Sequence, residues 1–428
     1  MNILVVEDSL VGRLAPASTA RPAWAITCGS YRLIDWLSRI EGTLATHVRP
    51  FLTEIVAADF PAIVSEVDRN VETTLIVNAR LAPTFTNFAK LNAFAKTHGQ
   101  SGTSIAAGQA AIAIETAVLC AAAEEAGSTV GQFAAGVLAS SATGGLQFQS
   151  VDAEFMMLDN PHNIVDAHMK CCAENLEFRL TSGEYQQLSD GVYLSKKSPA
   201  AIPQSVVFDC SEGPVVIDSG CSIGPFTYFR GPVYIGPGSK ISEHSSIKDG
   251  VSIGHTCKMG GEIEGVVVEP FSNKQHYGFL GHSYLGSWIN LGAGTCNSDL
   301  KNTYGTVNMH PLVGQQEKIA TGMQFVGCLI GDYAKTAINT SIFTGKLIGV
   351  GSMVYGMATT NVPSFVNYAR SIGQMGLLPP EVIVTTQQRM FGRRKVEQRD
   401  CDAQLIRDMY QLTNEQRPDG LTADQLEF

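Results

Sequence analysis

The sequence predicts an α/β domain, then a solenoid of six-residue repeats, then a helical C-terminal segment. Three observations predict this order: apolar runs alternate with helical spacing up to about residue 195, bulky apolar residues then recur every six positions, and helical spacing returns after Pro380. Of the 42 glycines, 25 lie between Gly213 and Gly356, so the composition changes where the repeats begin. We therefore expect domains at residues 1–195, 205–360 and 375–428.

The overall composition narrows the possible partners. The 428 residues are 44% hydrophobic and 16% charged, with a formal net charge of -10. Nucleic-acid binders gather Lys and Arg, so no nucleic-acid partner is expected. The most apolar long stretch, Ile105–Ala123, is interrupted by Gln109 and Glu115, so no membrane segment is expected. Met1–Leu10 lacks the basic lead-in of a secretory signal, which predicts a cytoplasmic protein.

The first 195 residues have the alternating pattern of an α/β domain. Ile3–Val6 and Thr74–Val77 are short apolar runs suited to buried parallel strands. Tyr31–Ile40 and Phe85–Ala95 have helical spacing, and the alternation predicts a doubly wound sheet. The stretch Ala106–Gly145 is rich in Ala and Gly, which predicts close-packed helices.

The middle of the chain carries a repeat of six residues. Eight bulky apolar residues follow one another six apart without a slip: Ile217, Ile223, Phe229, Ile235, Ile241, Ile247, Ile253 and Met259. Each hexad would supply one short strand and one tight corner, and three hexads would close one coil of a triangular prism. An ordinary meander is the alternative, but hairpins do not hold a strict count over eight units.

Two interruptions of the repeat are visible. The pattern falters from Glu262 to Gly278, where we expect an extruded loop, and it returns at Leu285 and Leu291. A second irregular stretch, Asn297–Gln324, precedes another ladder of Ile330, Thr336, Ile342, Ile348 and Val354. Beyond the repeats, the spacing of apolar residues from Pro380 to Arg417 predicts one or two helices packed on the prism or on a neighbouring subunit.

The segment 272–297, SNKQHYGFLGHSYLGSWINLGAGTCN, resembles the acetyltransferase half of the bifunctional GlmU family. The whole chain is most similar to GlmU-like sugar nucleotidyltransferases. The resemblance implies a nucleotidyltransferase-fold (Rossmann-like) N-terminal domain, a left-handed parallel β-helix that forms a homotrimer, and a sugar phosphate or nucleotide sugar as small-molecule substrate.

The resemblance also implies a base for acetyl transfer. It places His276 on the family's catalytic histidine, and His282 is a rival, while a solvated loop histidine is the alternative for His276. Acetyl transfer from acetyl-CoA to a sugar amine needs a base, and histidine has a suitable pKa near neutral pH. A backbone N–H in the corner formed by Gly292, Ala293 and Gly294 would stabilise the oxyanion, and Ala293 would contact coenzyme A.

Further residues are implied to bind the sugar phosphate. Asn290 and Asn297 fall on positions that contact sugar or coenzyme, and Arg230 on the family's phosphate-binding arginine. Lys274 is a weaker candidate for phosphate binding. Asn290 could instead belong to a side-chain ladder along the coil, and Arg230 could be an ordinary surface charge.

The resemblance is poorer at the place where this family binds nucleotide and Mg²⁺. Acidic Glu7 and Asp8 follow the first strand where backbone amides should receive phosphate, and like charges would repel a triphosphate. The family's metal-binding aspartate, expected after Thr74–Val77, is replaced by the sequence Asn-Ala-Arg at 78–80. Arg13 and Arg21 could still hold a phosphate, and no set of metal ligands is assigned.

Three functions therefore remain open at this point. The first is an acyltransferase that acts through the β-helix, with a degenerate N-terminal domain. The second is a sugar-1-phosphate nucleotidyltransferase that uses Mg²⁺ and a nucleoside triphosphate, with the β-helix serving oligomerisation. The third is a non-catalytic trimeric scaffold. The intact stretch from His276 to Thr295 favours the first.

Overall fold

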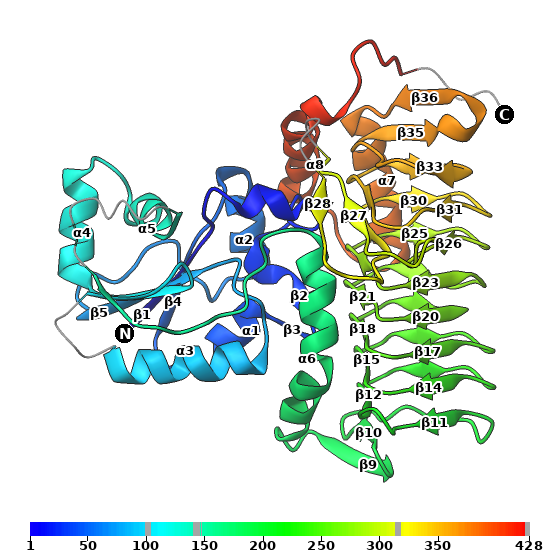
Figure 1. Cartoon of the computed structure of the whole chain (residues 1–428), viewed down its shortest axis with the longest axis horizontal. Coiled ribbons are helices and arrows are strands. Elements are labelled where there is room, and N and C mark those ends of the chain that lie inside the picture. The colour runs from blue at the N-terminus through cyan, green and yellow to red at the C-terminus, as the bar shows by residue number, and fades with distance from the viewer. Residues whose placement is uncertain (99–103, 140–145, 147, 313–317, 424–428) are drawn as a thin grey trace. The chain divides into compact units, whose positions relative to one another are not determined.

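The computed structural model describes residues 1–98, 104–139, 146, 148–312 and 318–423 (Figure 1). Its contacts group the chain into two compact units. Unit 1 comprises Met1–Leu14, Arg21–Thr27 and Tyr31–Asn163, and unit 2 comprises Ala15–Ala20, Cys28–Ser30 and Ile164–Phe428. The sequence pattern predicts the first domain boundary near residue 195, whereas the contacts group residues 164–195 with the repeats.

Unit 1 is built on a six-stranded mixed sheet with the order β4-β1-β5-β7-β6-β8. The central strand β1 is parallel to β4 and to β5, and all of its residues are buried. Strands buried on both faces have continuous apolar sequences, so β1 and β5 were predictable. The strands are β1 (Asn2–Val6), β4 (Thr43–His47), β5 (Thr73–Asn78), β6 (Ile105–Ala107), β7 (Ala111–Glu115) and β8 (Gln149–Ser150).

The helices of unit 1 agree in part with the sequence pattern. The helix predicted at 85–95 is confirmed as α3 (Phe85–His98), but the one predicted at 31–40 is reduced to α1 (Leu33–Leu37). The shortening occurs because Tyr31–Arg32 form strand β3, and the Asp35 carboxylate then accepts the Arg32 N–H at 2.8 Å. The remaining short elements are α2 (Thr53–Asp59), β2 (Thr27–Cys28), η1 (Val11–Leu14), η2 (Ala23–Ala25) and η3 (Pro50–Leu52).

The prediction of helices throughout 106–145 is wrong for its first part. Strands β6 and β7 form an antiparallel hairpin there, and β7 pairs antiparallel with β5. The alternation Ala-Ile-Ala-Ile places Ile112 and Ile114 in the core, and this packing overrides the helix preference of alanine. Helices α4 (Thr116–Glu125) and α5 (Val130–Ala139) follow as predicted, while residues 140–145 lie outside the described residues.

Unit 2 contains a triangular β-helix with three faces of stacked strands (Figure 1). The first face has β9 (Tyr185–Ser189), β10 (Val192–Ser195), β12 (Val215–Ile217), β15 (Val233–Ile235), β18 (Val251–Ile253), β21 (Val267–Val268), β24 (Tyr284–Leu285), β29 (Cys328–Ile330) and β32 (Lys346–Ile348). The second has β13 (Ser222–Ile223), β16 (Lys240–Ile241), β19 (Lys258–Met259), β22 (Asn273–Lys274), β25 (Asn290–Leu291), β30 (Lys335–Thr336), β33 (Met353–Val354), β35 (Val366–Ala369) and β36 (Gln374–Leu377). The third has β11 (Val207–Asp209), β14 (Tyr228–Arg230), β17 (Ser246–Lys248), β20 (Glu262–Glu264) and β23 (Phe279–Gly281), and continues through β26 (Cys296–Asn297), β31 (Ser341–Ile342) and β34 (Met357–Ala358).

The six-residue ladder is confirmed as the inner lining of these coils. Val215 pairs with Val233, and Val233 pairs with Val251, so these coils contain 18 residues each. All eight predicted ladder residues, from Ile217 to Met259, are at most 5% exposed. Stacking of the coils therefore buries the apolar ladder and pairs the backbone groups at the same time.

The prediction of an extruded loop between Glu262 and Gly278 is wrong. This stretch instead forms β20, β21 and β22, and Ser252 pairs with Val267, only 15 positions later. The coil is shortened at its corners while Ile263 and Val268 keep the ladder filled. The interruption of the six-residue spacing thus reflects a shorter coil and not an insertion.

The second irregular stretch is a true excursion from the coil. Tyr284 pairs with Leu329, 45 positions later, and the intervening chain carries an antiparallel pair, β27 (Asn308–Met309) and β28 (Ile319–Ala320). Residues 313–317 of this excursion are outside the described ranges.

Helices cover parts of the β-helix. The predicted C-terminal helices are confirmed as α7 (Pro380–Arg393) and α8 (Asp400–Leu412), and the Phe391 ring of α7 stacks on Trp288 at 4.3 Å. Helix α6 (His162–Leu180) contacts a different corner of the coil through His168, which bonds to Gly250. The remaining short helices are η4 (Arg370–Ile372) and η5 (Asn414–Gln416). In the part of the chain that is described, no helix combines the length and apolarity needed to cross a bilayer.

Candidate functional site

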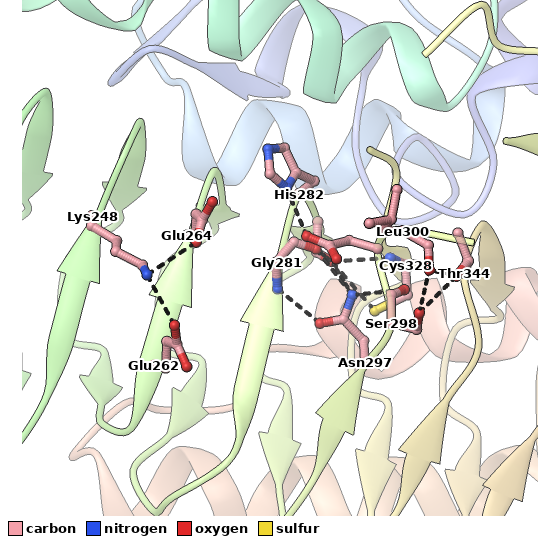
Figure 2. A network of polar contacts seen from close by, with 12 residues as sticks. Lys248, Glu262, Glu264, Gly281, His282, Asn297, Ser298, Leu300, Cys328 and Thr344 are labelled. Atoms are coloured by element: carbon pink, nitrogen blue, oxygen red, sulfur yellow. Dashed lines mark hydrogen bonds and ion pairs between the residues drawn. The ribbon is translucent and has the colours of Figure 1, made fainter. Parts of the chain in front are cut away.

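His282 lies at the corner that joins β23 to β24. Its backbone N–H donates to the carbonyl of Glu264 at 2.8 Å, and its own carbonyl accepts from Gly327 N–H at 2.8 Å. These bonds connect the residue to the coils on either side of it. The corner is therefore fixed, and the side chain projects from a rigid part of the β-helix (Figure 2).

The imidazole of His282 is paired with a carboxylate. Its Nδ1 lies 2.8 Å from Oδ2 of Asp299, and both side chains are 13% exposed. Asp299 lies two positions after the end of β26 and 17 positions beyond His282. The coil at this level also has 17 residues, because Val267 pairs with Tyr284. Asp299 therefore lies one coil beyond His282, at the stacked position.

The residues around this dyad leave room for it. A Cβ atom on Gly281 would lie 2.4 Å from Oδ2 of Asp299, so only glycine allows the carboxylate to approach. A Cβ atom on Gly265 would lie 3.2 Å from Nε2 of His282. The ring of Phe325 stacks on the imidazole with centroids 5.2 Å apart. Phe325 thus fixes the ring plane. On the side of Gly265, the Sδ of Met169 also lies 3.1 Å from the position of that Cβ atom, so a glycine backbone and a thioether flank the Nε2 edge there.

This arrangement suits a general base. With its Nδ1 proton donated to Asp299, the neutral imidazole presents a lone pair on Nε2, which can accept a proton. The carboxylate would then stabilise the imidazolium that forms. The chemistry available here is proton abstraction from a nucleophile that approaches the Nε2 edge.

A second histidine nearby is structural. Nδ1 of His168 accepts the N–H of Gly29 at 2.9 Å, and its Nε2 donates to the carbonyl of Gly250 at 2.8 Å. The pKa of His168 is lowered to about 4. Burial is the largest cause and the nearby His282 also lowers the pKa, whereas the hydrogen bond to Gly250 raises it. Both ring nitrogens are hydrogen-bonded, so His168 is neutral and joins α6 to the coil.

A charged group also lies on neighbouring strands of the same face. Lys248 on β17 contacts Glu262 at 3.0 Å and Glu264 at 3.3 Å, both on β20 (Figure 2). Burial lowers the pKa of Lys248, but the bonds to Glu262 and Glu264 outweigh it and the pKa is raised. The ammonium is therefore committed to two carboxylates.

His276 lies at a different corner from His282. It sits between β22 and β23 and is exposed, and its ring makes no hydrogen bond to any residue that the structure describes. The strand β23 separates the two histidines, so they do not share a site. On geometry, His282 has the orienting partner and the partial burial that His276 lacks.

Lys274 is buried inside the coil beneath the corner of His276. Its Nζ donates to the carbonyl of Gly260 at 2.9 Å and to that of His276 at 2.7 Å. Burial lowers the pKa of Lys274 to about 8. The side chain fastens two corners, and its burial separates it from a phosphate in solvent.

The two predicted asparagines occupy different environments. The side chain of Asn297 is buried, accepts the N–H of Gly281 at 2.8 Å, and donates to the carbonyl of Gly281 at 3.0 Å (Figure 2). It joins neighbouring coils and points away from solvent. Asn290 is exposed and accepts a bond of 3.5 Å from Asn273 on the previous coil, which is the ladder arrangement.

The corner at 292–294 uses two of its three amides internally. Gly292 N–H donates to the carbonyl of Thr336 and to its Oγ1, at 3.2 and 3.0 Å, and Gly294 N–H donates to the carbonyl of Tyr277 at 3.0 Å. The carbonyl of Ala293 accepts the N–H of Asn339 at 2.7 Å. The structure thus stacks this corner on that of His276, with the amides of Gly292 and Gly294 already bonded.

The predicted phosphate-binding arginines differ in what they contact. Arg230 forms a two-pronged ion pair with Asp249, and this bond raises its pKa. In unit 1, Arg13 is exposed on η1, and the carbonyl of half-buried Arg21 accepts a bond from Arg49 at 2.9 Å. The fork of Arg230 is therefore occupied, and the phosphate roles of Arg13 and Arg21 stay predictions.

Sequence reasoning missed the partners of His282. Asp299 and Phe325 bracket the excursion from the coil, and nothing in their local sequence marks them. The distance of 17 positions between His282 and Asp299 is the available signal, once the length of the local coil is known.

The comparisons with known proteins agree with this two-part structure. A family model described as sugar nucleotidyl transferase matches residues 3–183, and a model described as bacterial transferase hexapeptide (six repeats) matches residues 214–249. A bifunctional sugar-1-phosphate nucleotidylyltransferase/acetyltransferase from Sulfurisphaera tokodaii is 28% identical over 207 residues, which are 48% of this chain and 46% of that protein. The bifunctional protein GlmU of Synechococcus elongatus is 28% identical over 167 residues, 35% of this chain and 32% of that protein.

Solved structures with low similarity to this chain were also found. A UDP-N-acetylglucosamine acyltransferase from Francisella novicida is 14% identical with a TM-score of 0.28, covering 51% of this chain and 86% of that one. An N-acyltransferase from Bacillus cereus in complex with dTDP and 3-hydroxybutyryl-CoA is 12% identical with a TM-score of 0.17, covering 51% and 96%.

The chain spans less than half the length of these two curated relatives. Both relatives are named as bifunctional proteins, and the two family models match separate parts of this chain. The resemblance to the GlmU-like family is therefore confirmed: the chain matches a sugar nucleotidyl transferase model over residues 3–183 and a hexapeptide model over residues 214–249, and it is similar to GlmU-type proteins.

Proposed function

We propose that this chain is an acyltransferase that moves an acetyl group from acetyl-CoA to the amine of an amino sugar or its phosphate. The observation that carries the proposal is the pairing of His282 with Asp299 at a fixed corner of the hexapeptide β-helix. Since the curated relatives are named as nucleotidylyltransferase/acetyltransferases, the coarser class is a sugar-phosphate transferase.

The proposed reaction needs one base and no metal. The amine nitrogen attacks the thioester carbonyl, and Nε2 of His282 accepts the proton that the nitrogen loses. The tetrahedral intermediate collapses, the carbon–sulfur bond breaks, and the imidazolium returns its proton to the departing thiolate. The products are the amide and coenzyme A thiol. Asp299 holds the imidazole in the tautomer that this sequence requires and stabilises its charged form.

A nucleotidyltransferase that uses Mg²⁺ and a nucleoside triphosphate is the second candidate. The family match over residues 3–183 favours it. The carboxylate Asp8 at the relevant sheet edge is paired with Arg80, which opposes metal binding there. A homotrimeric assembly and a cytoplasmic location stay predictions from the sequence.

The test is release of free thiol from acetyl-CoA by the purified full chain, with glucosamine-1-phosphate and other amino sugars as acceptors. We expect acceptor-dependent release that falls by about 100- to 10,000-fold in His282→Ala, since this is the contribution of a positioned base. His276→Ala is the matched control and should keep its rate. No release with any amino sugar, or equal loss in both variants, would contradict the proposal. Pyrophosphate release from a triphosphate and sugar phosphate would support the second candidate.

A further inference from the structure

The carboxyl ends of two central strands in unit 1 meet at one edge of the sheet. Val6 of β1 pairs with Asn78 of β5, so residues just beyond these positions lie side by side. Asp8 follows β1 and Arg80 follows β5. In open α/β sheets ligands bind outside the carboxyl ends of the strands. The resemblance in the sequence implies a Mg²⁺ site at this edge.

Arg80 fills this place with its guanidinium. The residue is 0% exposed. Its Nε and Nη2 donate to the two carboxylate oxygens of Asp8 at 2.9 and 2.8 Å. Its Nη1 donates to the carbonyl of Leu158 at 3.2 Å and to the carboxylate of Asp159. A single arginine thus joins two carboxylates from different parts of the unit.

The Asp8 carboxylate has no oxygen left for a metal. Oδ1 also accepts the backbone N–H of Leu10 at 3.0 Å, and Oδ2 accepts the side-chain amide of Asn78 at 2.9 Å. Burial raises the pKa of Asp8, but the bonds from Arg80 and Asn78 outweigh it and the pKa is lowered. Each oxygen therefore accepts two hydrogen bonds, which is its ordinary capacity.

The neighbouring acid follows the same rule. Both oxygens of Glu7 are bonded to Arg49, at 3.0 and 3.1 Å, and also accept the backbone N–H groups of Ala23 and Arg49. Among the residues that the structure describes, no three His, Cys, Asp or Glu side chains are grouped so as to hold a metal ion. The side chains at this edge do not fit a Mg²⁺ ion, which requires open carboxylate oxygens.

We propose that Arg80 is a built-in replacement for the divalent cation in unit 1. Its guanidinium supplies the positive charge that holds Asp8 and Asp159 together, so the unit is folded without metal and binds no Mg²⁺ at this edge. This assignment is independent of the acyl transfer proposed for the β-helix.

The first measurement uses the wild-type full chain. Mn²⁺ has the same preference for carboxylate ligands as Mg²⁺, and its free concentration is read by electron paramagnetic resonance. We expect no saturable site with a Kd below about 1 mM, a weak limit for a carboxylate site. A tighter site that disappears in Asp8→Asn would overturn the proposal, whatever the variants below do.

The second measurement asks whether removing the arginine restores a metal site. In Arg80→Met the Tm measured in EDTA should fall by about 10 °C, because an ion-pair partner is lost from a buried carboxylate. Mn²⁺ should recover part of this loss. The double variant Arg80→Met/Asp8→Asn is the matched control and should show no recovery. Equal recovery in both variants would contradict the replacement of a cation by Arg80. If Arg80→Met does not fold, the wild-type titration alone decides.

Discussion

The two charged clusters of this chain differ in how completely their groups are bonded. In unit 1, every oxygen of Asp8 is occupied, and the partner Arg80 is wholly buried. In unit 2, the carboxylate of Asp299 bonds to only one nitrogen of His282, and the other nitrogen lies beside Gly265, where the thioether of Met169 is also close. A closed network stabilises a fold, whereas a half-bonded, oriented group is available for chemistry.

This difference assigns separate roles to the two regions. The sheet edge of unit 1 lies where ligands bind in such sheets, but its polar groups are bonded to one another. The fold alone does not mark the corner of the β-helix as a ligand site, yet this corner holds an oriented base. Substitutions in each region test this contrast.

Breaking the closed cluster should destabilise unit 1 strongly. Asp8→Ala leaves Arg80 without its main partner in a buried place, and such losses cost about 3–5 kcal/mol. Urea unfolding is followed by fluorescence in a Trp288→Phe background, so that only the buried Trp24 and Trp36 of unit 1 report. Asp159→Ala is the control: its carboxylate is 55% exposed, so a loss below about 1 kcal/mol is expected. Equal losses in the two variants would refute the closed-cluster account.

Removing the orienting carboxylate should slow the proposed reaction. In Asp299→Asn the amide no longer fixes the tautomer of His282, and we expect a ten- to hundredfold lower kcat, about 1.4–2.7 kcal/mol. The measurement is the rate of thiol release at saturating acetyl-CoA, with the Tm as a check on folding. An unchanged kcat in a folded variant would remove Asp299 from the mechanism.

The buried His168, with both ring nitrogens hydrogen-bonded, should make unit 2 less stable in acid. Because burial lowers the pKa of His168 to about 4, the unfolded state binds a proton between pH 6.5 and 4 that the folded state refuses. Stability therefore falls as the pH drops, by about 2 kcal/mol between pH 7 and pH 5. His168→Gln keeps a donor toward Gly250 and should lose this part of the slope. The Tm at both pH values measures it, and an identical slope in the variant would contradict the assignment.

The exposed histidine should contribute least. His276 has no bonded partner among the described residues, and His276→Ala is expected to change kcat/KM by less than about twofold, within 0.5 kcal/mol. A loss comparable with that of His282→Ala would exchange the roles of the two histidines.

The sequence predicted the architecture better than the site. The ladder from Ile217 to Met259 was readable because each coil repeats the same inward position. Its lapse after Met259 was misread as a loop, because shortened corners lose the six-residue count without losing the coil. Sheet pairing of Ala111–Glu115 was likewise hidden, since it depends on β5 far along the chain.

The site depended on contacts between coils, which local sequence does not contain. The sequence favoured His276 as the base, with His282 as its rival, and only the stacking of coils places Asp299 against His282. Lys274 and Asn297 carry polar groups suited to a ligand, yet the structure turns both inward. The substitution of Arg80 at the expected metal position was visible in the sequence, but its bonds to Asp8 were not.

One comparison of ligands tests directly whether the chemistry resides in the β-helix. The Tm of the full chain is measured with acetyl-CoA and, separately, with UTP and Mg²⁺, because a ligand of the native state raises stability by mass action. We predict a concentration-dependent rise with acetyl-CoA and none with UTP and Mg²⁺. A rise with UTP that requires Mg²⁺, without any response to acetyl-CoA, would contradict the account.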